Sequence, residues 1–333
     1  MEPYIFGETA FHHEGSVLYL KKLIDVAADS GLQGVKFQIL MGAENLLSKA
    51  HPQYEVLSKY VLTTQDWGVA FEYAKLRQLD VIVMPLDVEA FSLITRYRTL
   101  IHGLELHSVS FYDQVLLDAM QDSGLPIMLG IGGRTYSEIK EKVAFLGNQL
   151  TVLIAGFQAF PSKIRDIKIE RIQYYKETFP GIQLGYADHS SFSDPMAIKS
   201  CEYALLLGAT YFEKHITVDE GVQRVDFESA LGLEKMIALR QSLEFIAGEV
   251  IPVISTDKLL NIEPVEQAYR SRQRIAIAKT NIVLGEKLDD SNVIFRMTGS
   301  DEGFSALAEI LGKSASMNIH QYAIISAQNI IDT

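Results

Sequence analysis

The most informative stretches of this chain are Tyr186-Ala187-Asp188-His189-Ser190 and Phe212-Glu213-Lys214-His215-Ile216-Thr217. Each closes an apolar run typical of a β-strand, so each places a histidine beside a carboxylate at a strand end. Two imidazoles on neighbouring strand ends can hold one divalent metal, and carboxylates can orient them. A single strand-end histidine is more simply a hydrogen-bonded structural residue, but two in consecutive units favour a metal site.

Strand-like and helix-like stretches alternate around these two motifs. The expected strands are Tyr4–Glu8, Gly34–Gln38, Asp80–Asp87, Gly103–Val109, Pro126–Gly132, Leu150–Phe157, Ile182–His189 and Thr210–Ile216. The expected helices are Ser16–Ser30, Thr64–Gln78, Val88–Arg98, Asp113–Ser123, Tyr136–Leu146, Lys163–Phe179, Asp194–Leu207 and Glu228–Gly248. Eight such units in about 250 residues predict an α/β fold, the (β/α)8 TIM barrel. A doubly wound open sheet is the competitor, but the units contain no Gly-rich dinucleotide fingerprint.

The pattern changes after about residue 250. We expect residues 1–250 to form the barrel, residues 251–271 to form an irregular linker, and residues 272–333 to form a small β-rich domain. Its expected strands and turns are Arg274–Ala278, Leu284–Glu286, Val293–Arg296, Leu311–Lys313 and Tyr322–Ile325. A domain of this size is only marginally stable alone, so we expect it to pack against something.

The composition limits the class of protein. The 333 residues are 48% hydrophobic and carry a formal net charge of −12. This charge argues against nucleic acid as a partner, because phosphate contacts need basic clusters. No apolar run reaches the roughly 18 residues of a membrane span, and we expect no signal peptide. The single Cys201 excludes an intrachain disulfide, so we expect a cytoplasmic protein without a membrane partner.

Polar side chains gather where the expected strands end, which is the functional edge of a (β/α)8 barrel. They are Glu8, Lys36, Gln38, Asp87, Ser108, Ser110, Gln158, His189, Glu213 and His215. Lys36 lies in an apolar strand, and a buried ammonium is costly unless an anion or carboxylate pairs with it. We therefore expect Lys36 to be functional, whereas Asp87 and Ser110 are equally compatible with solvated loops.

At these residues the chain resembles the sialic acid synthase (N-acetylneuraminate synthase) family over nearly its whole length. The motifs that carry the resemblance are Gly7-Glu8-Thr9-Ala10-Phe11-His12-His13-Glu14-Gly15, Val35-Lys36-Phe37-Gln38, Met84-Pro85-Leu86-Asp87, Gly185-Tyr186-Ala187-Asp188-His189-Ser190, Glu213-Lys214-His215-Ile216-Thr217-Val218-Asp219 and Arg224-Val225-Asp226. The resemblance implies a barrel joined to a C-terminal domain similar to type III antifreeze protein, also called SAF. The turn Arg296-Met297-Thr298-Gly299 resembles a segment of that domain.

The resemblance also implies roles for individual residues. His189 and His215 match ligands of manganese, so Mn²⁺ or another divalent metal is the implied cofactor. Glu8, Lys36 and Glu213 are the implied catalytic residues, and Lys36 matches a lysine that binds phosphoenolpyruvate. The candidate substrate-binding residues are Gln38, Ser108, Arg134, Gln158, Asp226 and Arg296, of which Arg296 would reach the sugar across a dimer.

Several positions depart from the family pattern. Glu105 stands where the family has a second lysine for phosphoenolpyruvate, Ser110 replaces a glutamate, and Gly130 and Ala187 replace serines. Arg134 is a candidate replacement cation, although a solvated loop arginine is equally compatible. The sequence thus indicates retained metal ligation and weakened phosphoenolpyruvate binding, provided that the Glu105 carboxylate faces the barrel mouth.

The resemblance implies a metal-dependent aldol-type condensation of phosphoenolpyruvate with an N-acetylated amino-sugar aldehyde, which gives a nonulosonic acid. It also implies a homodimer in which the small domain covers the partner's barrel. A second interpretation is a degenerate paralogue that binds a sugar or a partner enzyme without turnover. A third is an aldolase for a substrate with less negative charge. A pocket lined only by acids would favour binding, and Lys36 and Arg134 converging on one anion site would favour catalysis.

Overall fold

The computed structural model describes residues 2–254 and 262–332. The chain divides into two compact units, Met1–Ile254 and Ser255–Thr333, each with a hydrophobic core of its own. Among the described helices, none has the length and apolar character that crossing a membrane requires.

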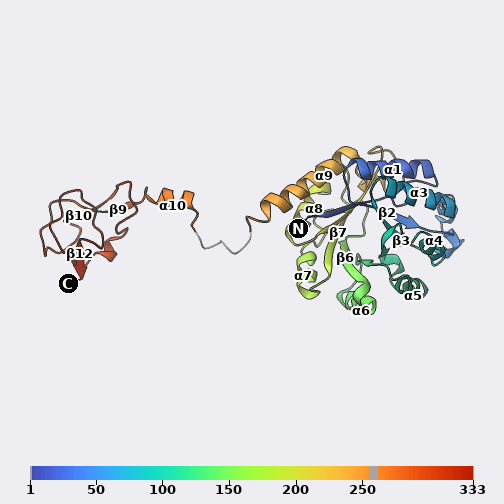
Figure 1. The fold of residues 1–333 in the computed structure, drawn as a ribbon, viewed down its shortest axis with the longest axis horizontal. Coiled ribbons are helices and arrows are strands. Elements are labelled where there is room, and N and C mark those ends of the chain that lie inside the picture. The colour runs from blue at the N-terminus through green and yellow to red at the C-terminus, as the bar shows by residue number, and fades with distance from the viewer. Residues whose placement is uncertain (1, 255–261, 333) are drawn as a thin grey trace. The chain divides into compact units, whose positions relative to one another are not determined.

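In the first unit, eight parallel strands close into a barrel in chain order, with β8 beside β1 (Figure 1). They are β1 (Tyr4–Glu8), β2 (Gly34–Ile39), β3 (Asp80–Pro85), β4 (Ile101–Leu106), β5 (Ile127–Gly130), β6 (Leu150–Gly156), β7 (Gln183–Asp188) and β8 (Tyr211–His215). The (β/α)8 prediction is therefore confirmed, and every expected strand overlaps an observed one.

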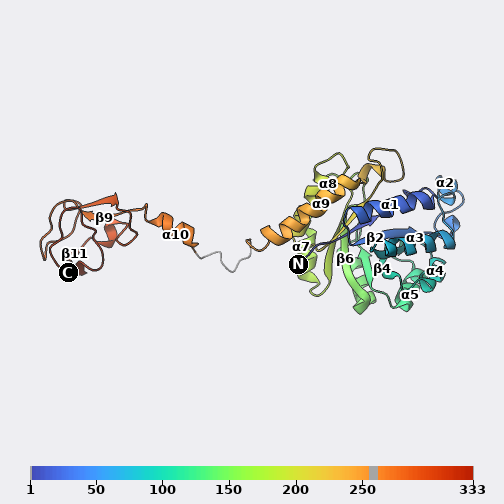
Figure 2. The same cartoon turned by 45° about the horizontal axis from the view of Figure 1, so that its top comes forward.

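Helices surround this barrel, and α9 lies beside α8 and α1 so that the ring is closed (Figure 2). They are α1 (Val17–Asp29), α2 (Tyr54–Ser58), α3 (Thr64–Leu76), α4 (Ala90–Arg96), α5 (Gln114–Ser123), α6 (Tyr136–Leu146), α7 (Arg171–Thr178), α8 (Met196–Leu206) and α9 (Leu233–Phe245). α3 begins at a capping box, in which Thr63 and Asp66 satisfy free backbone N–H groups.

Two expected helices begin later than their sequence pattern indicates. The expected helix Lys163–Phe179 is wrong over residues 163–170, which form turns. Just before them, Ser162 N donates to His189 O at 2.8 Å, and Ser162 makes an isolated parallel bridge to Ser190 after β7. The expected helix Glu228–Gly248 begins at Leu233, because Leu231 N donates to His215 O at 2.9 Å. In both cases a hydrogen bond to a strand end competes with the first helical turn.

The barrel has one apolar layer outside its strands and another within them. The larger core packs the strands against the helices. A smaller cluster inside the barrel includes Phe6, Ile82, Met128, Val152 and Ile154. The buried ammonium of Lys36 lies 5.9 Å from the centre of the Phe6 ring, so charged groups occupy the interior next to this apolar floor.

The second unit is small and β-rich, which is consistent with the expected SAF domain. It contains α10 (Pro264–Arg270), the antiparallel pair β9 (Arg274–Ala278) and β10 (Val293–Met297), and the antiparallel pair β11 (Lys313–Ala315) and β12 (Ile330–Asp332). The expected linker, residues 251–271, is not irregular throughout, because it contains α10. Linker residues 255–261 lie outside the described residues. Of the expected strands and turns, Leu284–Glu286 begins with a turn, and Tyr322–Ile325 forms no strand, although Ile324 makes an isolated bridge to Ile277.

Candidate functional site

A pocket of about 270 Å³ opens at the carboxyl ends of the barrel strands. Its lining contains four carboxylates and three imidazoles, which are Glu8, Glu105, Glu213, Asp226, His107, His189 and His215. It also includes Gln38, Ser108, Gly130, Gln158 and Ala187. The structure thus brings most of the candidate site residues into one cavity, although they come from six different strand ends or loops.

Lys36 lies at the base of this pocket within a cluster of three glutamates. Its Nζ donates to Glu105 Oε2 at 2.7 Å and to Glu213 Oε2 at 2.6 Å, and it lies 3.3 Å from Glu8 Oε1. Each of these side chains is at least 95% buried. The expected carboxylate partner of Lys36 is therefore present, and Glu105 is one such partner.

Burial and mutual repulsion set the protonation of this cluster. Burial, with Glu105 and Glu8 nearby, raises the pKa of Glu213 well above its usual value. Burial also raises the pKa of Glu105. Burial opposes ionisation of Glu8 too, but Lys36 and His215 bring the pKa of Glu8 well below its usual value. Lys36 is thus paired with three acids whose pKa values are shifted in opposite directions, downward for Glu8 and upward for Glu105 and Glu213.

His189 and His215 stand side by side, with ring centres 5.3 Å apart. His189 Nδ1 donates to the carbonyl oxygen of Phe157 at 3.1 Å, which leaves the Nε2 lone pair free to bind a ligand. His215 Nε2 lies 3.2 Å from Glu8 Oε2, and its Nδ1 lies 4.0 Å from Asp226 Oδ2. Burial lowers the pKa of both imidazoles, for His215 to about 3, so both rings are neutral and able to ligate a metal.

The donors present therefore suit a divalent metal held by two imidazoles with nearby carboxylates. They do not form a complete centre, since the described part of the chain holds no group of three or more His, Cys, Asp or Glu side chains placed to bind one ion. The remaining positions would fall to water or substrate.

Asp226 projects from the loop after β8 and has a strained backbone, with φ of 60°. The loop is held next to it, because His12 Nδ1 contacts Val225 O at 2.6 Å and His12 Nε2 contacts Thr217 Oγ1 at 2.9 Å. Burial and the Glu8 charge raise the pKa of Asp226 to about 6. The Asp226 carboxyl is thus presented to the pocket by a fixed loop.

Arg134, the candidate replacement cation of the barrel, is not brought into the pocket. Arg134 donates through Nη2 to the carbonyl of Ser108, packs over the Phe111 ring at 4.8 Å, and does not line the cavity. Arg296 belongs to the second unit, where its Nη1 donates to Phe295 O at 2.8 Å. Within residues 2–254, the lining of this pocket contains no arginine and no lysine.

Three of the four positions that depart from the family pattern lie in the pocket lining. Glu105, Gly130 and Ala187 all line the pocket, and a Cβ atom on Gly130 would lie 3.4 Å from Glu105 Oε1. By contrast, Asp87 accepts hydrogen bonds from Met41 N, at 2.8 Å, and Ala90 N, at 3.0 Å, so it organises loops instead. Glu105 and Gly130 are therefore neighbours in the pocket, whereas Ser110 lies outside its lining.

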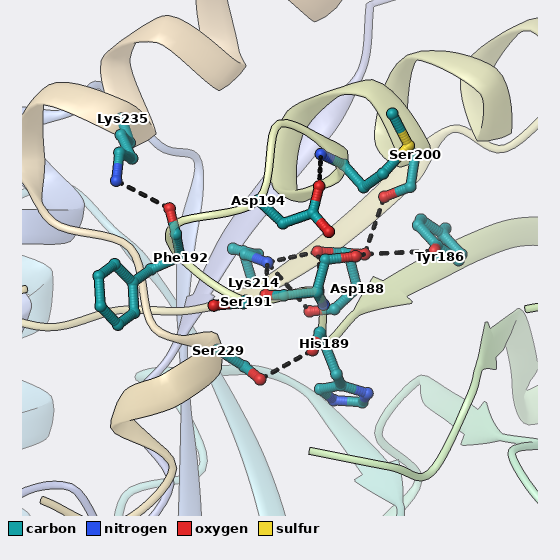
Figure 3. Close-up of polar contacts among 12 residues, drawn as sticks. Tyr186, Asp188, His189, Ser191, Phe192, Asp194, Ser200, Lys214, Ser229 and Lys235 are labelled. Atoms are coloured by element: carbon teal, nitrogen blue, oxygen red, sulfur yellow. Dashed lines mark hydrogen bonds and ion pairs between the residues drawn. The ribbon is translucent and has the colours of Figure 1, made fainter. Parts of the chain in front are cut away.

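A second buried charge pair lies on the outer face of the same strands (Figure 3). Lys214 donates to the Asp188 carboxylate, and both side chains are fully buried. Asp188 also accepts from the hydroxyls of Ser190 and Ser200, each at 2.8 Å. Because residues alternate along a strand, Asp188 and Lys214 face α8 while His189 and His215 face the pocket. The sequence analysis did not identify this pair, although Lys214, in an apolar strand, carries the same signal as Lys36.

The pair fixes the two histidines relative to each other. Asp188 and Lys214 are cross-strand partners in the β7–β8 register, one residue before His189 and His215. The His189 carbonyl is held as well, since it accepts from Ser229 Oγ at 2.8 Å (Figure 3). The ion pair thus ties β7 to β8 where the imidazoles emerge.

Comparisons with known proteins agree with this architecture. The chain is 24% identical over 345 residues to N,N'-diacetyllegionaminic acid synthase of Campylobacter jejuni. This alignment covers 96% of this chain and 98% of that protein. It is 26% identical over 318 residues to an uncharacterized protein of Methanocaldococcus jannaschii, or 93% of this chain and 89% of that protein.

Among solved structures, N-acetylneuraminic acid synthetase of Leptospira borgpetersenii aligns with a TM-score of 0.70 and 23% identity. The alignment covers 80% of this chain and 90% of that one, and it supports the fold. The model of the NeuB family matches residues 23–249, which span most of the barrel and include Lys36, His189 and His215. The chain therefore belongs to the NeuB family.

Proposed function

We propose that the pocket is the active site of a sialic acid synthase-like enzyme. It would join phosphoenolpyruvate to an N-acetylated amino-sugar aldehyde in a metal-dependent aldol-type condensation that gives a nonulosonic acid. The observation that carries the proposal is the placement of His189 and His215 beside Glu8 and Asp226 in one buried cavity. Family membership supports it, because the similar proteins include a legionaminic acid synthase.

In this proposal the chain's own residues have distinct tasks. A divalent metal, Mn²⁺ by the family resemblance, would be held by His189 and His215 and would supply a Lewis acid for the aldehyde oxygen. Gln38 donates to Glu8 Oε1 at 2.7 Å and so orients that carboxylate, which can accept a proton from the attacking water. Burial raises the pKa of Glu213 well above its usual value, which suits Glu213 to act as the acid, and Asp226 would accept a hydrogen bond from a sugar hydroxyl.

The Lys36 cluster predicts a low affinity for phosphoenolpyruvate. A phosphate about 4 Å from an ionised Glu105 would be repelled by about 4 kcal/mol at an effective dielectric near 20. That is about three powers of ten in affinity, and less to the extent that Glu105 is protonated. Lys36 cannot compensate, because its ammonium is already paired with carboxylates.

One specific observation favours a second candidate, a paralogue that binds the sugar or a partner enzyme without turnover. The described lining of the pocket has four carboxylates and no arginine or lysine, which suits a neutral ligand better than a trianion. Turnover assays with phosphoenolpyruvate, Mn²⁺ and a panel of N-acetylated hexosamines separate the two. Product formation supports the enzyme, whereas sugar binding without product supports the paralogue.

Calorimetric titration with phosphoenolpyruvate tests the role of Glu105 directly. Glu105→Gln removes the charge and keeps the shape, and Glu105→Lys restores a cation, so both should tighten binding, the lysine more strongly. Arg134→Ala is the matched control, since Arg134 lies outside the pocket lining and should leave binding unchanged. Tight binding by the wild type, unaltered in both Glu105 variants, would contradict the reasoning.

We further propose a homodimer in which the small domain, residues 272–333, contributes Arg296 to the partner's pocket. Arg296 is exposed and makes its only described side-chain hydrogen bond to its neighbour's carbonyl, so it is available for a ligand. Mixing Arg296→Ala with Glu8→Gln protein should restore part of the activity, because each hybrid dimer has one intact site. A monomer in light scattering would exclude this arrangement.

A further inference from the structure

A second cavity, of about 210 Å³, lies outside the barrel beneath helix α7. We call it the α7 cavity. Apolar groups form most of its wall, among them Ile131, Ala155, Phe157 and Ile172. Apolar walls of this kind favour an occupant with an apolar body, because such an occupant removes apolar surface from water.

Two cations stand at this cavity without partners. Lys168 and Arg171 belong to its lining, together with a single carboxylate, Asp166. The side chains of Lys168 and Arg171 are exposed and make no ion pair within the described residues. The surrounding segment adds Lys163 and Arg165, which make no ion pair within the described residues, and one more carboxylate, Glu170. Residues 163–171 thus carry four cations against two carboxylates in a chain of net charge −12.

The Tyr175 hydroxyl completes the polar part of the lining. Tyr175 is 5% exposed, lines the cavity, and its hydroxyl has no hydrogen-bond partner within residues 2–254. Arg171 and Tyr175 are four residues apart on α7 and therefore lie on the same face of the helix. Together they offer a guanidinium and a hydroxyl to the same ligand group.

The α7 cavity adjoins the candidate active site. Gly156 lines both cavities. Phe157 forms part of the α7 cavity, while its carbonyl accepts the hydrogen bond from His189 Nδ1. An occupant that displaces Phe157 would therefore act on the orientation of His189.

We propose that the α7 cavity binds a small organic carboxylate with an apolar body, and that its occupancy is transmitted to His189 through the Phe157 carbonyl. The apolar walls select the body, and Arg171, Lys168 and Tyr175 select the anionic group. The volume is below the roughly 300–1,000 Å³ of pockets for drug-sized ligands, so the ligand has the size of benzoate, not of a nucleotide. This proposal does not depend on the proposed condensation.

The test uses the full-length protein and ligand-observed NMR titration with benzoate, benzamide and benzylamine. Benzoate should bind at least about tenfold more tightly than the other two, since only benzoate pairs with the cations. Arg171→Gln and Lys168→Gln should each remove most of that preference while leaving benzamide binding unchanged. Lys163→Gln is the matched control, because Lys163 lies on the same segment but not in the cavity lining, and it should change nothing.

Ile172→Trp should block all three ligands by filling the cavity, with circular dichroism as the check on folding. In ¹⁵N-histidine spectra, benzoate should shift the His189 ring signal of the wild type and not of Arg171→Gln. Equal affinity for benzoate and benzamide, or a benzoate preference that survives Arg171→Gln, would overturn the site. An unshifted His189 signal at saturation would overturn the coupling.

Discussion

The Asp188–Lys214 pair allows a prediction whose size follows from its contacts. Both side chains are fully buried, and removing one partner of such a pair leaves an uncompensated charge that costs about 3–5 kcal/mol. The two partners are not equivalent. Without Lys214, the Asp188 carboxylate still accepts from Ser190 and Ser200 at 2.8 Å. Without Asp188, the Lys214 ammonium has only two carbonyl oxygens at 3.4 Å.

We therefore expect Asp188→Leu to destabilise the barrel more than Lys214→Met, near the upper and lower ends of that range. The double variant should be more stable than either single variant, because no buried charge is then left unpaired. Lys235→Met is the matched control. Its partner Glu220 lies 2.6 Å away, but the lysine is 40% exposed, so the loss should stay within about 1 kcal/mol.

Urea unfolding followed by tryptophan fluorescence measures these differences for the barrel alone, since Trp67 is the single tryptophan and lies in its core. The double variant should keep the barrel folded but loosen the β7–β8 pairing, so its affinity for Mn²⁺ should fall while stability is largely retained. Destabilisation of the double variant equal to the sum of the single effects would refute the account. So would a smaller effect of Asp188→Leu than of Lys214→Met.

Two further predictions concern the metal-binding histidines and the buried His13. A variant with both His189→Ala and His215→Ala should lose tight Mn²⁺ binding in elemental analysis and titration, and unchanged affinity would exclude the proposed site. Burial lowers the pKa of His13 from 6.5 to about 4, so the folded barrel should lose up to about 3 kcal/mol as the pH falls from 6.5 to 4, where the unfolded chain takes up the proton first. Urea unfolding at these two pH values should show that His13→Gln loses less free energy of unfolding on acidification than wild type. The exposed His51→Gln is the control, and an equal loss in all three proteins would exclude His13 as the cause.

The sequence by itself determined the barrel and the ring of polar strand ends. Both are local properties: apolar runs and helical spacing identify the eight units, and in parallel strands the residues that end each run must meet at one edge. The partnership of His189 with His215 follows from the same rule, because their strands are neighbours.

Only the tertiary structure decided which charges neutralise each other. Lys36, Glu105 and Glu213 are separated by up to 177 residues, and their contact exists only because the barrel closes. In the closed barrel, Glu105 forms an ion pair with Lys36, and Arg134 packs over the Phe111 ring. Asp188 and Lys214 pair on the outer face of the strands. Closure also paired Ser162 with the segment that follows β7, and residues 163–170 form turns instead of a helix. Long-range hydrogen bonds and burial set these outcomes, and neither leaves a periodic signal in the local sequence.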